Sequence, residues 1–203
     1  MKMLFTKKDK FEIRTAQIKD EIKDASGNLL VRLNLRYPDI KCGKKDALSK
    51  FAKPFYKEFA LAFEKYAKTE LLALAEKANN ASPDTFLPYS AVMKYEITQN
   101  DEDFVSVLQE ISVSDGIALP CIERKTQVWE RAHGSKCKIS FFLPRRELDG
   151  SLSDKLDKSA RKSFDTSLFV LREGRLEFFM RSNQGYSSVT VPISQKKISN
   201  VTE

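Results

Sequence analysis

The stretch that decides the fold is SLFVLREGRLEFFMRSNQGYSSVTVPIS, residues Ser167 to Ser194. Apolar and aromatic side chains alternate with polar ones along it, and two clusters of turn residues interrupt the alternation, at Glu173-Gly174 and at Ser182-Asn183-Gln184-Gly185. Such alternation is typical of strands with one buried face. The stretch therefore predicts three consecutive strands, at Ser167–Arg172, Arg175–Arg181 and Ser187–Ile193.

The residues directly before these strands predict a short helix. Leu152, Leu156, Ala160 and Phe164 recur in helical steps. We therefore expect a helix over about residues 152–164. The polar segment Arg145–Ser151 is predicted to be a loop.

Further toward the N-terminus, alternating apolar and polar runs are separated by short polar turns. One turn, Asn100-Asp101-Glu102-Asp103, carries three carboxylates, and we interpret it as a solvated loop, with a weak calcium site as the alternative. Strands joined by short turns predict an antiparallel meander. The pairs Phe141-Phe142 and Phe178-Phe179 lie in apolar predicted strands and are expected to be core residues. The runs are Tyr89–Thr98, Phe104–Val113, Ile117–Arg131 and Lys136–Leu143.

A long amphipathic helix is predicted over about residues 44–79. Pro54 lies inside it, so we expect a kink or a restart of the helix there. The opposite face is filled by lysine and glutamate. The apolar residues that recur at three- and four-residue steps are Phe51, Phe55, Phe59, Ala62, Phe63, Tyr66, Leu71, Leu74, Ala75 and Ala78.

A hairpin precedes the long helix, because Phe11–Ile22 and Leu29–Leu35 alternate around a Gly-Asn turn. Tyr37-Pro38 is expected to end the second strand, since proline cannot continue a hydrogen-bonded ladder. Together the elements predict an α+β fold. Its antiparallel sheet or sheets are crossed by the long helix (about 44–79), with the short helix (about 152–164) on the flank.

The length of 203 residues is that of one domain. We expect a single domain over residues 1–203. Two sub-parts are conceivable within it, a first over residues 1–145 with the hairpin, the long helix and the meander, and a second over residues 146–203 with the short helix and the closing strands.

The composition, 41% hydrophobic and 31% charged, predicts a soluble globular protein with a formal charge of +7. The N-terminus lacks the apolar run of a signal peptide, and no stretch is apolar for about 18 residues. We therefore expect a cytoplasmic protein without a membrane span, or an extracellular one if a leader has been removed. The cysteines, Cys42, Cys121 and Cys137, are expected to be reduced and mostly buried.

The only histidine, His133, offers two reactive alternatives. One is a zinc site with Cys121 and Cys137, and the other is a Cys137–His133 nucleophile pair. The spacing lacks a paired Cys-x-x-Cys, and no residue that would orient the histidine is evident. We therefore expect no catalytic residue, no metal and no cofactor, and interpret His133 as a turn residue beside a small buried cysteine.

Weak candidates for contact with a ligand are Trp129, Arg131 and His133. Trp129 is flanked by charged residues and would be either a partly exposed anchor at a binding surface or a core or edge tryptophan. Basic clusters leave nucleic-acid binding open as an alternative. They are Lys41/Lys44/Lys45, Arg145/Arg146, Lys155/Lys158/Arg161/Lys162 and Lys196/Lys197.

Several motifs, taken in their order along the chain, carry a family resemblance. They are Tyr37-Pro38 with Gly43, the aromatic helix Phe55–Lys77, Tyr89-Ser90-Ala91-Val92 with Phe104-Val105-Ser106-Val107, and the closing segment Leu176–Ser194. They resemble an uncharacterised bacterial domain of the DUF3298/DUF4163-like type. That domain is the extracellular part of lysozyme-sensing anti-sigma factors and an accessory domain beside polysaccharide deacetylases.

The resemblance implies a scaffold that binds a protein or a cell-envelope-related ligand, and it assigns no ligand-contacting residue. We therefore expect a non-catalytic ligand- or protein-binding module of unknown specificity. The alternatives are a basic nucleic-acid-binding protein and an uncharacterised hydrolase with an unrecognised site.

Overall fold

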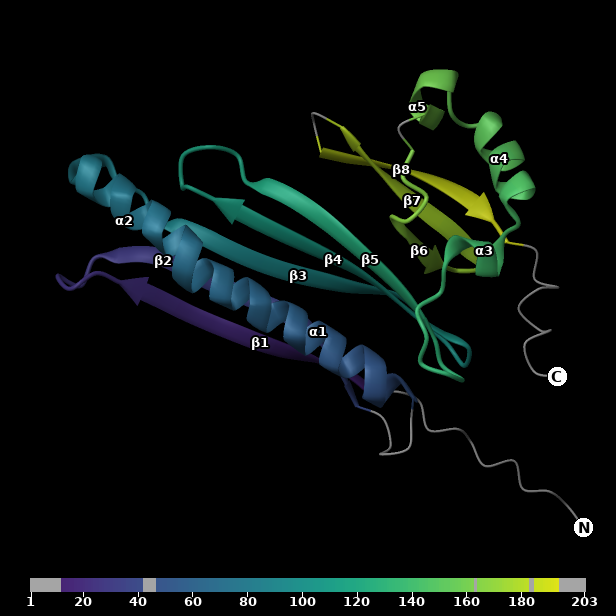
Figure 1. The fold of residues 1–203 in the computed structure, drawn as a ribbon, viewed down its shortest axis with the longest axis horizontal. Coiled ribbons are helices and arrows are strands. Elements are labelled where there is room, and N and C mark those ends of the chain that lie inside the picture. The colour runs from purple at the N-terminus through teal and green to yellow at the C-terminus, as the bar shows by residue number, and fades with distance from the viewer. Residues whose placement is uncertain (1–11, 42–46, 163, 183–184, 194–203) are drawn as a thin grey trace, which may run out of the picture.

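The computed structural model describes residues 12–41, 47–162, 164–182 and 185–193. Its strands form a five-stranded sheet in the order β1-β2-β3-β4-β5 and a three-stranded sheet in the order β6-β7-β8 (Figure 1). The fold is α+β, as the sequence predicts. The first sheet consists of β1 (Glu12–Lys23), β2 (Leu29–Lys41), β3 (Tyr89–Asn100), β4 (Phe104–Ser114) and β5 (Cys121–Glu130). The second consists of β6 (Phe169–Arg172), β7 (Arg175–Ser182) and β8 (Gly185–Pro192).

The N-terminal hairpin is confirmed, but its second strand is longer than predicted. The expectation that Tyr37-Pro38 ends this strand is wrong, because β2 continues to Lys41 with Pro38 opposite Thr15 of β1. Beyond Leu35 the described residues give β2 a ladder with β1 alone. A strand with one open side tolerates a residue that has no N–H group.

A long helical segment crosses one face of the five-stranded sheet (Figure 1). It consists of α1 (Ala47–Tyr66), a π-helical turn (Ala67–Leu71) and α2 (Leu72–Ala81). The helix does not restart at Pro54, which lies inside α1. The irregular part of the segment is the π-helical turn, which begins at Ala67 directly after α1 ends. The predicted start of the helix at residues 44–46 lies outside the described residues. The residues of this segment that are buried against the sheet are Leu48, Ala52, Tyr56, Ala60, Ala67, Leu71 and Ala75.

The crossing helix makes β3 parallel to β2, over the five residues Val31–Leu35 and Tyr89–Met93. A strand–helix–strand connection returns the chain to the starting end of the sheet, so the next strand runs in the same direction. The predicted antiparallel meander is confirmed for β3, β4 and β5. A short 3₁₀ turn, Pro83–Thr85, connects α2 to β3.

The predicted strand Lys136–Leu143 is wrong, and so is the predicted loop Arg145–Ser151. Only Lys136 makes a strand-like bridge, to Trp129, and three short helices follow. A short apolar run such as Phe141-Phe142-Leu143 is compatible with a strand or with a helix, and here the two phenylalanines are helical. The helices are α3 (Ile139–Phe142), α4 (Arg145–Ser153) and α5 (Lys158–Lys162), which replace the single helix expected over 152–164.

The second sheet packs on the face of the first sheet that α1 leaves uncovered, over β4 and β5. Leu108 of β4 contacts Val170 of β6 and Phe179 of β7 in one buried cluster. As a result β4 is covered on both faces, and all six residues from Phe104 to Gln109 are buried. The three predicted closing strands are confirmed, although the turn residues Asn183 and Gln184 lie outside the described residues.

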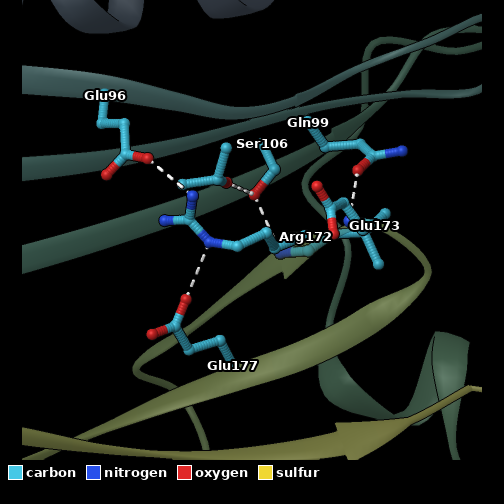
Figure 2. A network of polar contacts seen from close by, with 8 residues as sticks. Glu96, Gln99, Ser106, Arg172, Glu173 and Glu177 are labelled. Carbon is cyan, nitrogen blue, oxygen red and sulfur yellow. Dashed lines mark hydrogen bonds and ion pairs between the residues drawn. The ribbon is translucent and has the colours of Figure 1, made fainter.

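The outer edge of β6 is hydrogen-bonded to side chains of the first sheet (Figure 2). The Leu171 N–H donates to Ser106 Oγ of β4 at 2.9 Å, and the Glu173 N–H donates to Gln99 Oε1 of β3 at 2.9 Å. Arg172 lies between them and bonds Glu96 at 2.7 Å and Glu177 at 2.9 Å. These contacts join the two sheets through polar groups at an edge that would otherwise lack partners.

No helix among the described residues is both long enough and apolar enough to cross a membrane.

Candidate ligand-binding site

The three short helices form a cap beside the second sheet, on the side away from the five-stranded sheet (Figure 1). Pro144 directly precedes α4, where its fixed φ and missing N–H favour a helix start. Leu148 and Leu152 lie one turn apart on α4, and both are buried in the core cluster that the second sheet also lines. α4 therefore packs its apolar side against the second sheet and presents polar side chains outward.

A pocket of about 540 Å³ lies in this cap. Its apolar part is formed by side chains of the core cluster, including Leu148, Leu152 and the partly buried Phe164. Its polar part is formed by side chains that are exposed at the surface. The polar lining residues are Ser140, Arg145, Asp149, Arg161 and Thr166. The volume and the mixed lining are in the range of small-molecule sites in proteins.

The charge at the rim of this cap pocket is positive. Arg145 and Asp149 form an ion pair at 3.8 Å, with 94% and 67% of their side chains exposed. An ion pair of that length and exposure is easily opened by a competing anion. Arg161 has no ion pair within the part of the chain that the structure describes, so the rim offers two guanidinium groups and one carboxylate.

Trp129 is buried, with 3% of its surface exposed. Its indole N–H donates to the Tyr56 hydroxyl of α1 at 2.7 Å, and its ring packs edge-on against Phe55 with centroids 5.6 Å apart. Of its two predicted roles, the structure therefore shows the core tryptophan. It joins β5 to the long helix through these contacts.

Arg131 and His133 lie in the turn after β5, and neither lines the cap pocket. Arg131 Nη2 donates to Asn100 Oδ1 at 2.8 Å. His133 Nδ1 lies 3.0 Å from Glu130 Oε1, and Ser135 Oγ donates to Glu130 Oε2 at 3.0 Å. The Glu130 carboxylate therefore organises this turn, while the imidazole remains largely exposed.

The zinc alternative, which needs Cys121 and Cys137 side by side, is not assembled. Cys121 begins β5 opposite Val113, whereas the Cys137 N–H bonds Val128 O near the other end of that strand. Seven residues of strand separate these two places, which is on the order of 20 Å. No group of three His, Cys, Asp or Glu side chains that could hold a metal occurs among the described residues. Cys42 lies outside them.

The two described cysteines are expected to differ sharply in reactivity. Burial raises the pKa of the Cys137 thiol to about 12, so its thiolate is scarce at neutral pH. Cys121 is exposed, which corrects the expectation of mostly buried cysteines. Iodoacetamide at about pH 8 should label Cys121 and spare Cys137 in the folded protein, as peptide mass spectrometry would show. Equal labelling of both would contradict the placement of Cys137, and labelling in denaturant is the control.

In the acidic turn Asn100-Asp101-Glu102-Asp103, the carboxylate of Asp101 accepts hydrogen bonds from backbone N–H groups. Asp101 Oδ1 accepts the N–H groups of Asp103 and Phe104 at 2.9 and 2.8 Å, and Asp101 Oδ2 accepts a hydrogen bond from the Gln99 amide. Asp101 thus stabilises the turn between β3 and β4. Of the basic clusters Arg145/Arg146 and Lys155/Lys158/Arg161/Lys162, the structure brings Arg145 and Arg161 together at the cap pocket, while Lys44, Lys45, Lys196 and Lys197 lie outside the described residues.

The architecture defines a class, an α+β protein with two stacked sheets and a long crossing helix, and solved proteins share it. A DUF3298 family protein from Bacteroides fragilis NCTC 9343 superposes with a TM-score of 0.60 at 13% identity, covering 93% of this chain and 97% of that one. A DUF3298 family protein from Pseudomonas aeruginosa PAO1 gives a TM-score of 0.54 at 13% identity, covering 92% and 96%. No family model and no curated protein sequence matches the chain.

The chain therefore has the fold of DUF3298 family proteins, and the predicted resemblance is confirmed at the level of the fold. The cap pocket was missed, because the segments that line it were interpreted as a strand and a loop. The spacing of Leu148 and Leu152 beside two arginines was the available signal, since apolar residues four apart mark one face of a helix.

Proposed function

We propose that the protein is a non-catalytic binding module whose cap pocket takes an amphiphilic anion. The single observation that carries the proposal is the union of an apolar floor with arginines at the rim of one pocket. An apolar chain would lie on Leu148, Leu152 and Phe164, and its acidic head would meet Arg145 and Arg161. Arginine suits this role because its planar fork pairs with a carboxylate through two hydrogen bonds.

The lining gives less support to catalysis. Ser140 and Thr166 are the hydroxyls of the described lining, and Asp149 is its carboxylate. Asp149 pairs with Arg145, and a nucleophile needs a base within hydrogen-bond reach. The same arginines would serve nucleic-acid binding, but the apolar floor beneath them favours a ligand with an apolar part.

The test compares octanoate with 1-octanol, which share an apolar chain and differ in the charged head. We expect octanoate to shift amide resonances of α4 and α5 with a Kd on the order of 1 mM. It should bind at least about fivefold more tightly than octanol, because a charge-assisted hydrogen bond is stronger than a neutral one. Arg161→Gln should abolish that preference.

Lys158→Gln is the matched control, because Lys158 is exposed on the same helix and is not part of the lining. It should keep the preference for octanoate. If octanoate perturbs no residue of the cap, or if both variants behave alike, the proposed site is wrong. Near-unchanged amide spectra of both variants without ligand would show that the fold is intact.

A further inference from the structure

A second depression, of about 640 Å³, lies on the five-stranded sheet at the place where β2 and β3 separate. Their parallel ladder ends at Leu35 and Met93, although β2 continues to Lys41 and β3 to Asn100. Tyr95 lies in this gap. Its ring packs in the core beneath α1, and its hydroxyl lies 2.8 Å from Thr15 Oγ1 of β1.

The first residue after the last paired position is a cation on both strands, Arg36 on β2 and Lys94 on β3. Leu35 and Met93 are buried beneath the helix, and successive strand residues point to opposite faces. Arg36 and Lys94 therefore emerge side by side on the face away from α1. Both are exposed and both line the depression, together with Thr15, Gln17 and Tyr95.

The carboxylates around this place are engaged elsewhere. Glu96, two residues after Lys94, bonds Arg172 at 2.7 Å, and Glu110, opposite Lys94 on β4, bonds Arg124 at 2.8 Å. Glu21 of β1 pairs with Arg32 at 3.5 Å. Within the described residues neither Arg36 nor Lys94 has an ion pair, so two like charges adjoin and neither is paired with a carboxylate.

We infer that this depression is an oxyanion-binding site, which takes a carboxylate or phosphate group between Arg36 and Lys94. An anion there would relieve the repulsion between the two cations. The Gln17 amide would add a neutral donor, although it now donates to Asn34 Oδ1 at 2.8 Å. The hydroxyl pair Thr15–Tyr95 holds the opposite wall in place across the gap. This site lies on the first sheet and is separate from the cap pocket.

The test titrates the protein with inorganic phosphate and, separately, with a tetraglutamate peptide, and follows amide resonances. Saturable shifts are expected at Gln17, Arg36 and Lys94. Whichever of the two titrations saturates at the lower ligand concentration identifies the preferred ligand group, phosphate or carboxylate. The double variant Arg36→Gln/Lys94→Gln should weaken binding at least about tenfold, because two charge-assisted contacts are lost.

The matched control is Lys57→Gln/Lys77→Gln, which removes two exposed charges from the helical segment. It should change the affinity less than about twofold, since exposed charges beyond a Debye length are screened. If both double variants weakened anion binding equally, the loss would be explained by the lower net charge of the protein, and the inference would be overturned. So would the absence of saturable shifts at the three residues in both arms.

Discussion

Replacing Trp129 with alanine is expected to lower the free energy of unfolding by about 3–5 kcal/mol. The side chain is 3% exposed, and its removal leaves a cavity between β5 and α1. It also leaves the Tyr56 hydroxyl, which accepts the indole N–H at 2.7 Å, without that partner. Urea unfolding followed by circular dichroism is the suitable measurement, because Trp129 is the only tryptophan and its fluorescence is lost with it.

Two further variants separate the cavity from the hydrogen bond. Tyr56→Phe keeps the packing and deprives the buried indole N–H of its acceptor, which should cost about 1–3 kcal/mol. Leu119→Ala is the control, because Leu119 is 94% exposed and surface substitutions usually change stability by less than about 0.5 kcal/mol. If Trp129→Ala were as mild as Leu119→Ala, the tryptophan would not be the link between sheet and helix.

The second large effect is expected for Ser106→Ala, which should lower the free energy of unfolding by about 1–3 kcal/mol. Ser106 is fully buried. Its hydroxyl oxygen accepts the Leu171 N–H at 2.9 Å and a hydrogen bond from Thr98 Oγ1 at 2.8 Å. Alanine offers neither donor an acceptor, so a backbone N–H of β6 stays buried and unpaired.

Hydrogen exchange gives this prediction a local measurement. The Leu171 amide should exchange faster in Ser106→Ala than in the unmodified protein, and by more than the loss of global stability explains. Ser112→Ala, on the same strand, is the control and should leave that amide protected. Unchanged protection of Leu171 in Ser106→Ala would mean that the serine does not hold the edge of β6.

The sequence was sufficient where one period dominated. Alternation located the strands of the hairpin, the meander and the closing sheet, and the aromatic stripe located the long helix. It was not sufficient to place β3 beside β2 in parallel, although a helix between two strands is the connection that a parallel pair requires. The predicted strand end at Pro38 was wrong, because a proline ends a central strand but is tolerated in a strand that has a hydrogen-bonded neighbour on one side only.

The candidate site was harder to predict because it depends on two ambiguous segments. The run Phe141-Phe142-Leu143 has no period that separates a strand from a short helix. The segment Arg145–Ser151 is polar apart from Leu148, so its partner Leu152 was assigned to the next element. The oxyanion-binding depression depends on where two strands separate, which no local pattern encodes.

The side chains on the outer edge of β6 also bear on how copies of this protein could meet. An unpaired strand edge is a template for a strand of another molecule. Ser106 and Gln99 occupy backbone donors of that edge, and this leaves β8 as the edge of the second sheet in the described residues. β8 ends in Pro192, which has no N–H to offer, so a strand added to β8 loses a hydrogen bond at that position, whereas on β6 the backbone donors are already occupied.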